Sequence, residues 1–281
     1  MEYEELIKTI EYFPPLSDST EWVRKRYEEG AENVDIIKIV RIIESDALLA
    51  ANILKLINAP FYGFSTKIAS VSQAVSLFGT QIIYGLVIKY SMSEQLVANT
   101  DAYNISAKKF NDMCHVQSAL MLQWYSKIDL RHAQFLAPLA LIMESGKLIV
   151  ANEIRKASDT LEFQRGLKKC ELIEEYENEV FETSSYFISG LLFEHWNLEP
   201  LYVTMLKNLD FEDNDTSGKM EYYIDTLDVI RTAVNVKEIL TDASIKKAAI
   251  IVENLDLDPE HFITVAKRVK KAYLKNKDRQ I

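Results

Sequence analysis

Residues 43–79 read IESDALLAANILKLINAPFYGFSTKIASVSQAVSLFG, and this stretch decides how the rest of the chain is interpreted. Asp46 is placed as an N-cap, because its carboxylate can accept a backbone N–H of the first helical turn. Apolar residues then recur at helical spacing, at Leu49, Ile53, Leu56 and Ile57. Since other apolar residues widen this face, we expect a helix that is buried on most of its sides.

The end of this helix carries its own signals. Pro60 disfavours helical backbone at the residue before it, so the helix should end near Asn58, whose side chain can bond backbone groups freed there. Gly63 lies among aromatic residues and is expected in a left-handed or tight conformation. Ser72 can cap the next helix, and Gly79 interrupts it.

Three ordered segments of this stretch carry a family resemblance. They read Asp-x-x-Leu, Leu-x-x-Ile-Asn-x-x-Phe-Tyr-Gly and Ile-x-x-Val-x-x-Ala-Val-x-Leu-Phe-Gly. Together they resemble the bacterial HDOD family, a signalling output domain related to the HD metal-dependent hydrolases, and the resemblance covers roughly residues 13–210. It implies an all-α fold, a regulatory role and no common catalytic activity. The motif positions expected to be structural are Asp46, Asn58, Phe61, Tyr62, Gly63 and Gly79.

The hydrophobic periodicity along the whole chain also predicts an all-α protein, with no sustained strand alternation. We expect a multi-helix bundle in residues 1–98, an HD-like helical half in residues 99–210, and a C-terminal helical extension in residues 211–281 packed on the body. Residues 133–152 and 161–179 are each expected to form one helix. The acidic stretch 210–219, DFEDNDTSGK, is the best linker candidate.

Composition limits the function classes. The formal net charge of -10 over 281 residues argues against broad binding to nucleic acid or to anionic membranes. Two cysteines give no disulfide framework and fit a reducing compartment. The acidic, amphipathic N-terminus does not resemble a signal peptide. The sequence also shows no run of about 18 apolar residues, so we expect no membrane insertion. We therefore expect a cytoplasmic protein.

The resemblance also indicates where an HD-type metal site would lie. The family pattern Leu-x-His-Asp-x-Gly-Lys aligns with residues 141–147, which places Met143 at the His position and Glu144 at the Asp position. A thioether is a poor ligand for hard or borderline divalent ions. His115 aligns with the first family His, Tyr186 with a later His, and Asn208 with a trailing His pair.

Only two of these positions keep a side chain that could be a ligand, so we expect no metal, no cofactor and no catalysis. Lys147 keeps the family lysine. Glu144 lies in an apolar helix and needs a partner, for which His115 and Lys147 are the two candidates. The expected remnant positions are His115, Met143, Glu144, Lys147, Tyr186 and Asn208.

Three functions stay open at this point. The first is a non-enzymatic signalling module that binds one or more other signalling proteins. The second is a divergent metal-dependent phosphohydrolase that uses His115 and Glu144 with ligands that do not align. The third is a sensor of a nucleotide second messenger, with the degenerate site kept as a pocket. Phosphate-binding glycine motifs are absent from the sequence, and this disfavours a dinucleotide or P-loop site.

Overall fold

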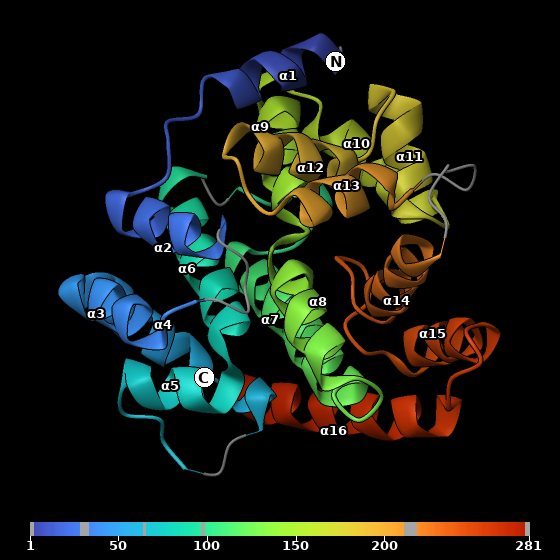
Figure 1. Ribbon diagram of the computed structural model, residues 1–281. Coiled ribbons are helices and arrows are strands. Elements are labelled where there is room, and N and C mark those ends of the chain that lie inside the picture. Colours follow the sequence, from blue (N-terminus) through green and yellow to red (C-terminus); the bar gives the residue numbers. More distant parts are fainter. Residues whose placement is uncertain (1–2, 29–33, 64–65, 97–98, 211–217, 279–281) are drawn as a thin grey trace. The chain divides into compact units, whose positions relative to one another are not determined.

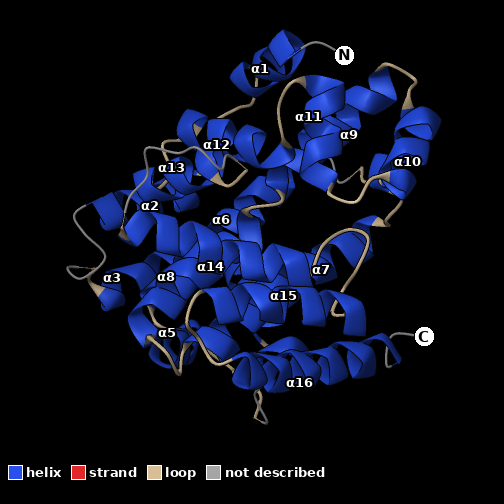
Figure 2. Ribbon diagram, turned by 90° about the vertical axis from the view of Figure 1, so that its right-hand side faces the viewer, coloured by secondary structure: helices blue, strands red, loops and turns tan. Residues whose placement is uncertain are grey.

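The computed structural model describes residues 3–28, 34–63, 66–96, 99–210 and 218–278, and these residues are mostly helical (Figure 1; Figure 2). The all-α prediction is confirmed for this part of the chain, which contains no strand beyond an isolated bridge between Val234 and Ile239. Most of the expected linker, residues 211–217, lies outside the described residues.

The chain divides into two compact units that interleave along the sequence. The first unit comprises Met1–Pro15, Ser93–Met113 and Met143–Leu227, and the second comprises Leu16–Met92, Cys114–Ile142 and Asp228–Ile281. The units interleave along the sequence, so their boundaries differ from those of the expected segments 1–98, 99–210 and 211–281. The three-segment domain organisation stays a prediction.

The first unit is built around the contacts of α12 with α9, α13 and α1. Its complete elements are α1 (Tyr3–Glu11), η3 (Asp101–Tyr103), α9 (Ser145–Lys156), α10 (Thr160–Lys169), α11 (Ile173–Phe181), α12 (Ser185–His195) and α13 (Pro200–Asn208). Three further helices have residues in both units, namely α6 (Thr80–Gln95), α7 (Ala107–Tyr125) and α14 (Lys219–Ala233).

The second unit packs α3 against α2, α4 and α5, and α16 against α15 and η2. Its complete elements are α2 (Asp18–Glu28), α3 (Ile36–Ser45), α4 (Ala47–Ile57), η2 (Pro60–Tyr62), α5 (Val71–Phe78), α8 (Leu130–Ile142), α15 (Asp242–Asn254) and α16 (Pro259–Asp278).

Two expected helices are each broken in two. Residues 133–152 belong to α8 and α9, with a turn at Met143 and Glu144, and residues 161–179 belong to α10 and α11, with extended backbone at Cys170. A tertiary contact accounts for the first break. The Ser189 hydroxyl on α12 donates to the Met143 carbonyl at 2.6 Å and accepts from the Gly146 N–H at 2.7 Å, so it takes backbone groups that a continuous helix would pair internally.

The local signals of residues 43–63 are confirmed. Asp46 caps α4 by accepting the Leu49 N–H at 3.0 Å. Asn58 follows the last residue of α4, and its side chain bonds the Leu54 carbonyl at 2.7 Å and both backbone groups of Ile68, at 2.8 and 2.9 Å. Gly63 has φ of 75°, the left-handed conformation that glycine adopts without strain.

Two other expectations about this stretch were wrong. The N-cap of α5 is Ser70 rather than Ser72, since the Ser70 hydroxyl accepts the Gln73 N–H and the helix begins two residues earlier. The helix α4 is also not buried on most sides. Only Leu49, Ile53 and Ile57 are buried, because its neighbours α3 and α5 cover one face.

A further correction concerns hydropathy. The helical run Leu130–Lys156 is long and apolar enough to cross a membrane by length and composition, although the sequence suggested no such run. However, 89% of its apolar window is buried inside the structure, which is typical of a core helix.

Candidate functional site

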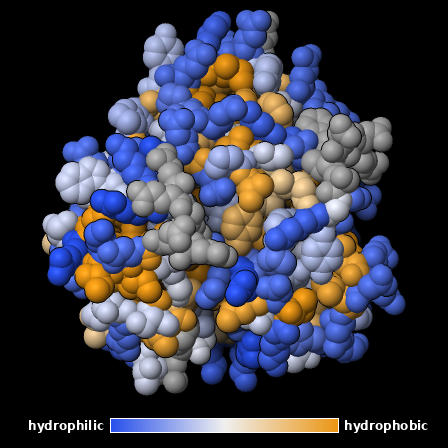
Figure 3. Space-filling view, viewed as in Figure 1, coloured by the Kyte–Doolittle hydropathy of each residue, from blue (hydrophilic) through white to orange (hydrophobic). Residues whose placement is uncertain are grey.

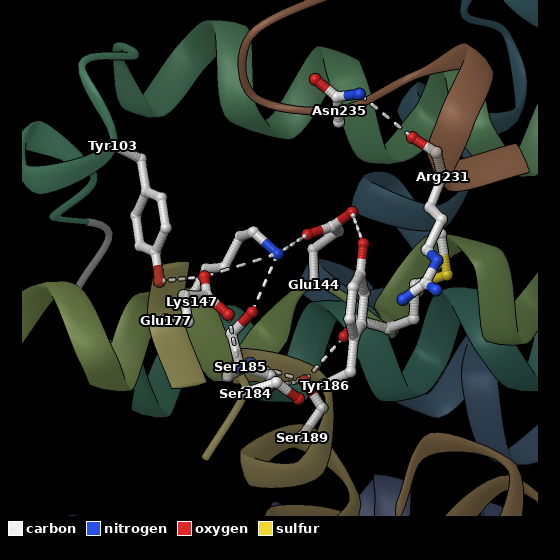
Figure 4. A network of polar contacts seen from close by, with 12 residues as sticks. Tyr103, Glu144, Lys147, Glu177, Ser184, Ser185, Tyr186, Ser189, Arg231 and Asn235 are labelled. Atoms are coloured by element: carbon white, nitrogen blue, oxygen red, sulfur yellow. Dashed lines mark hydrogen bonds and ion pairs between the residues drawn. The ribbon is translucent and has the colours of Figure 1, made fainter. Parts of the chain in front are cut away.

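The first unit contains a buried group of polar side chains around the HD-like motif of α9 (Figure 4). We call this group the buried polar cluster. Its members are nearly inaccessible to solvent and come from four elements and one turn: Tyr103, Glu144, Lys147, Glu177, Ser185 and Tyr186.

Close packing of α9 on α12 places these side chains. A Cβ on Gly146 would lie 1.9 Å from the Ser185 carbonyl oxygen and 2.8 Å from the Ser189 nitrogen, so only glycine allows this approach. Ser189 completes the contact through its bonds to Met143 and Gly146. Because Gly146 lets α9 approach α12 closely, the neighbouring Lys147 can reach Ser185 on α12.

The Lys147 ammonium group is the centre of the cluster (Figure 4). Its Nζ lies 2.9 Å from Glu144 Oε2 and 3.9 Å from Glu177 Oε1, and it donates to the Ser185 hydroxyl at 2.8 Å. It also lies 4.2 Å from the centre of the Tyr186 ring. Of the two partners expected for Glu144, Lys147 is thus the one with which it forms an ion pair.

Both carboxylates are held by further donors. The Tyr186 hydroxyl donates to Glu144 Oε1 at 2.9 Å. Glu177 accepts from the Tyr103 hydroxyl at 2.7 Å on one oxygen and from the Ser185 N–H at 2.7 Å on the other. Since buried charges are costly unless paired and hydrogen-bonded, these contacts explain how two carboxylates persist in the interior.

The pKa values follow from burial and charge. Burial by itself would lower the pKa of Lys147, but the Glu144 and Glu177 carboxylates together raise it above its usual value. Burial raises the pKa of Glu177, and Lys147 opposes this change. Burial, reinforced by Glu177, also raises the pKa of Tyr103 well above its usual value.

The contact between Ser185 and Lys147 has the composition of a Ser–Lys catalytic dyad. Such a dyad needs an unprotonated amine to accept the serine proton. Here the carboxylates stabilise the protonated ammonium, and both side chains are buried. The arrangement therefore favours a fixed ion pair over a nucleophile with its base.

His115 belongs to the second unit, on α7, and has a different environment. Its ring stacks on Phe61 with ring centres 6.4 Å apart, and its Nδ1 lies 3.5 Å from the Tyr62 hydroxyl. Nε2 is buried and has no hydrogen-bond partner among the described residues. Burial, with a smaller contribution from Lys89, lowers the pKa of His115 to about 3, so its imidazole is neutral at physiological pH.

The remaining predicted positions, Met143 and Asn208, have neither an imidazole nor a carboxylate group. Met143 is fully buried, and Asn208 bonds the Thr204 carbonyl of its own helix at 2.8 Å. Each of the other three histidines has a different partner: Asp129 for His132, the Phe13 carbonyl for His195 and the Trp124 carbonyl for His261. Phe61 and Tyr62 pack in the interior, whereas Phe64 lies outside the described residues.

Three members of the cluster, Glu177, Ser185 and Tyr103, were missed by the sequence interpretation. The sequence around Glu177, EEYENEVFE, resembles a solvated acidic face. One signal was present, because Glu177 follows Ile173 by four residues and precedes Phe181 by four, which places it on the buried face of α11. Nothing local marked Tyr103, which is 74 residues from its partner Glu177.

These residues do not fit an HD-type metal centre. Within the parts of the chain that the structure describes, no three His, Cys, Asp or Glu side chains are grouped so that they could hold a metal ion. The one carboxylate at a family ligand position, Glu144, is already paired with an ammonium group and a phenol. The donor set of a thioether, a phenol and a committed carboxylate is poor for a divalent ion.

Comparisons with solved structures support the fold. A protein of Shewanella amazonensis SB2B, named provisionally as a phosphohydrolase, is 14% identical with a TM-score of 0.69, over 97% of each chain. An HDOD domain protein of unknown function from Geobacter sulfurreducens is 12% identical with a TM-score of 0.68, over 98% of this chain and 95% of that one. A protein of Marinobacter aquaeolei VT8, named provisionally as a signal transduction protein, is 15% identical with a TM-score of 0.66, over 98% of this chain and 63% of that one.

No curated protein matches this sequence. The sequence model of the HDOD domain matches residues 14–210, which is more than two thirds of the chain and includes both the motif of residues 46–79 and the buried polar cluster. The chain therefore belongs to the HDOD domain family.

Proposed function

We propose that this protein is a non-enzymatic regulatory module of signal transduction that acts by binding other proteins. The single observation that carries the proposal is the ion pair between Lys147 and Glu144. It commits the one carboxylate at a family ligand position to an internal partner. Family membership and the signalling name of a structural neighbour support the regulatory role.

Exposed apolar side chains on α3 and α4 support the binding role. Figure 3 shows hydrophobic atoms gathered over these two helices, whose most exposed large apolar residues are Ile36, Ile37 and Leu48. Ile37 is 64% exposed and Leu48 is 63% exposed. Exposed apolar patches on a globular protein are typical of protein-binding surfaces.

Affinity capture from an extract of the native cell tests this role. We expect the wild-type protein to retain a specific partner, and Ile37→Glu and Leu48→Glu to lose it, because a carboxylate cannot enter an apolar interface without a partner of its own. Leu161→Glu on α10 is the matched control, since Leu161 is 69% exposed and lies in the other unit. Equal capture by all four proteins would contradict the proposed surface.

A further inference from the structure

The surroundings of the Lys147 ammonium group have the composition of an ammonium-binding site. A primary ammonium has three N–H donors and no acceptor, so it needs several acceptors around one point. Here it meets a carboxylate oxygen at 2.9 Å, a hydroxyl oxygen at 2.8 Å and a second carboxylate at 3.9 Å. The rings of Tyr186 and Tyr103 lie 4.2 and 5.8 Å from the nitrogen, within the range of cation–π attraction.

The acceptors are held in place by bonds that do not involve Lys147. Glu144 is held by the Tyr186 hydroxyl, and Glu177 is held by the Tyr103 hydroxyl and the Ser185 N–H. These bonds join the turn before α9 to α12, and α11 to α12 and η3, within the first unit. Shortening the lysine side chain therefore leaves the acceptors directed toward an unfilled point.

We propose that Glu144, Glu177, Ser185 and Tyr186 form a binding site for a primary ammonium group, which the chain fills with its own Lys147. The site selects an ammonium ion over a divalent metal because its acceptors are few and an aromatic face takes the place of further ligands. Magnesium and calcium need six or more oxygen ligands, and zinc favours several nitrogen or sulfur ligands. This inference does not depend on the proposed protein-binding function.

The variant Lys147→Ala tests the site with free alkylammonium ions. The n-propylammonium ion replaces the three carbons and the nitrogen that the substitution removes. We expect n-propylammonium chloride to raise the Tm of Lys147→Ala by about 3–5 °C at roughly ten times its Kd, and further with the logarithm of its concentration. Tetramethylammonium chloride and potassium chloride at equal ionic strength should have no such effect, since neither cation can donate an N–H.

The matched control lies on the same helix. Lys156 forms an ion pair with Glu153 at the same i,i+3 spacing, but its side chain is 61% exposed. We expect neither Lys156→Ala nor the wild-type protein to respond to n-propylammonium. A response of Lys156→Ala equal to that of Lys147→Ala, no response of Lys147→Ala, or an equal rise with Mn²⁺ or Zn²⁺ would overturn the proposal.

A second pair of variants decides the matter if Lys147→Ala does not fold. Replacing Glu144 as well, in Glu144→Gln with Lys147→Met, removes one carboxylate together with the ammonium that compensates it. We expect this double variant to melt at a higher temperature than Lys147→Met alone. A lower or equal Tm would show that Lys147 does not compensate Glu144 and would overturn the proposal.

Discussion

Lys147 and His115 are both basic side chains buried in helical units, but they have opposite electrostatic neighbours. Lys147 faces two carboxylates, and these hold its proton although burial favours the neutral amine. His115 faces aromatic rings, and burial together with the positive charge of Lys89 removes its proton. Burial acts in the same direction on both pKa values, so the neighbours decide which group stays charged.

The difference predicts that the two positions respond to substitution and to pH in different ways. The buried polar cluster contains oppositely charged side chains that pair with each other, so removal of one partner leaves an uncompensated charge in the interior. The rings that contact His115 are uncharged and its imidazole is neutral, so this region should tolerate loss of the side chain and respond instead to acid. Four variants or conditions test this difference.

The largest expected effect comes from Lys147→Met. It leaves Glu144 and Glu177 buried without a cation, and removal of one partner of a buried ion pair costs about 3–5 kcal/mol of unfolding free energy. Lys156→Met breaks a pair on the same helix whose lysine is 61% exposed, and it should cost less than about 1 kcal/mol. Urea unfolding followed by circular dichroism measures both values, and similar losses for the two variants would remove the distinction between the pairs.

Gly146→Ala should be the next most damaging change. The new Cβ would lie 1.9 Å from the Ser185 carbonyl oxygen, so α9 and α12 would have to separate and the cluster with them. We expect a loss of about 3 kcal/mol, at the upper end of the cost of overpacking a core. The same unfolding experiment measures it, and an unchanged midpoint would mean that the two helices do not approach as described.

Low pH should reduce the stability that the neutral, buried His115 contributes. The folded-state pKa of His115 is about 3, below the unfolded value of 6.5. The folded state therefore binds fewer protons, and the stability that this difference contributes is full above pH 6.5 and is lost as the pH falls toward 3. We expect the unfolding free energy of wild type to fall by about 2 kcal/mol more than that of His115→Phe between pH 7 and pH 5. Parallel pH profiles for the two proteins would contradict a buried neutral imidazole.

The smallest effect is expected at Gly63, next to the aromatic residues that contact His115. Gly63→Val places a β-branched residue at φ of 75°, which costs about 1–2 kcal/mol. The nearest atoms to a Cβ at this position belong to the Gln123 side chain at 3.7 Å, so strain rather than a clash would cause the loss. An unchanged Tm in a thermal scan would show that the backbone relaxes without cost.

The sequence predicted features that depend on neighbouring residues and missed those that depend on distant ones. Asp46, Asn58 and Gly63 were predicted correctly because capping and left-handed backbone are local chemistry. Lys147 was one of two candidate partners of Glu144, and these two residues lie only three positions apart in the sequence. The break between α8 and α9 was missed because Ser189, more than forty residues away, causes it. Glu177, Ser185 and Tyr103 were missed because their partners in the cluster are also distant in the sequence.

The exposure of α4 could not be predicted from hydropathy either. Its sequence ALLAANILKLI is apolar on nearly every side, and such helices are usually buried. The structure leaves Leu48 exposed because the neighbouring helices cover only one face. An apolar face that the fold does not cover is the feature from which we infer a binding surface.

We propose that Lys147 commits Glu144 to an internal ion pair and that the chain is not a metal-dependent hydrolase. Elemental analysis of the purified protein, combined with hydrolysis assays on phosphodiesters and nucleotides in the presence of Mn²⁺, Fe²⁺ or Mg²⁺, tests it most directly. We predict far less than one transition metal ion per chain and no hydrolysis above the rate without protein. About one bound Zn, Fe or Mn per chain, lost together with hydrolytic activity in His115→Ala, would contradict the claim.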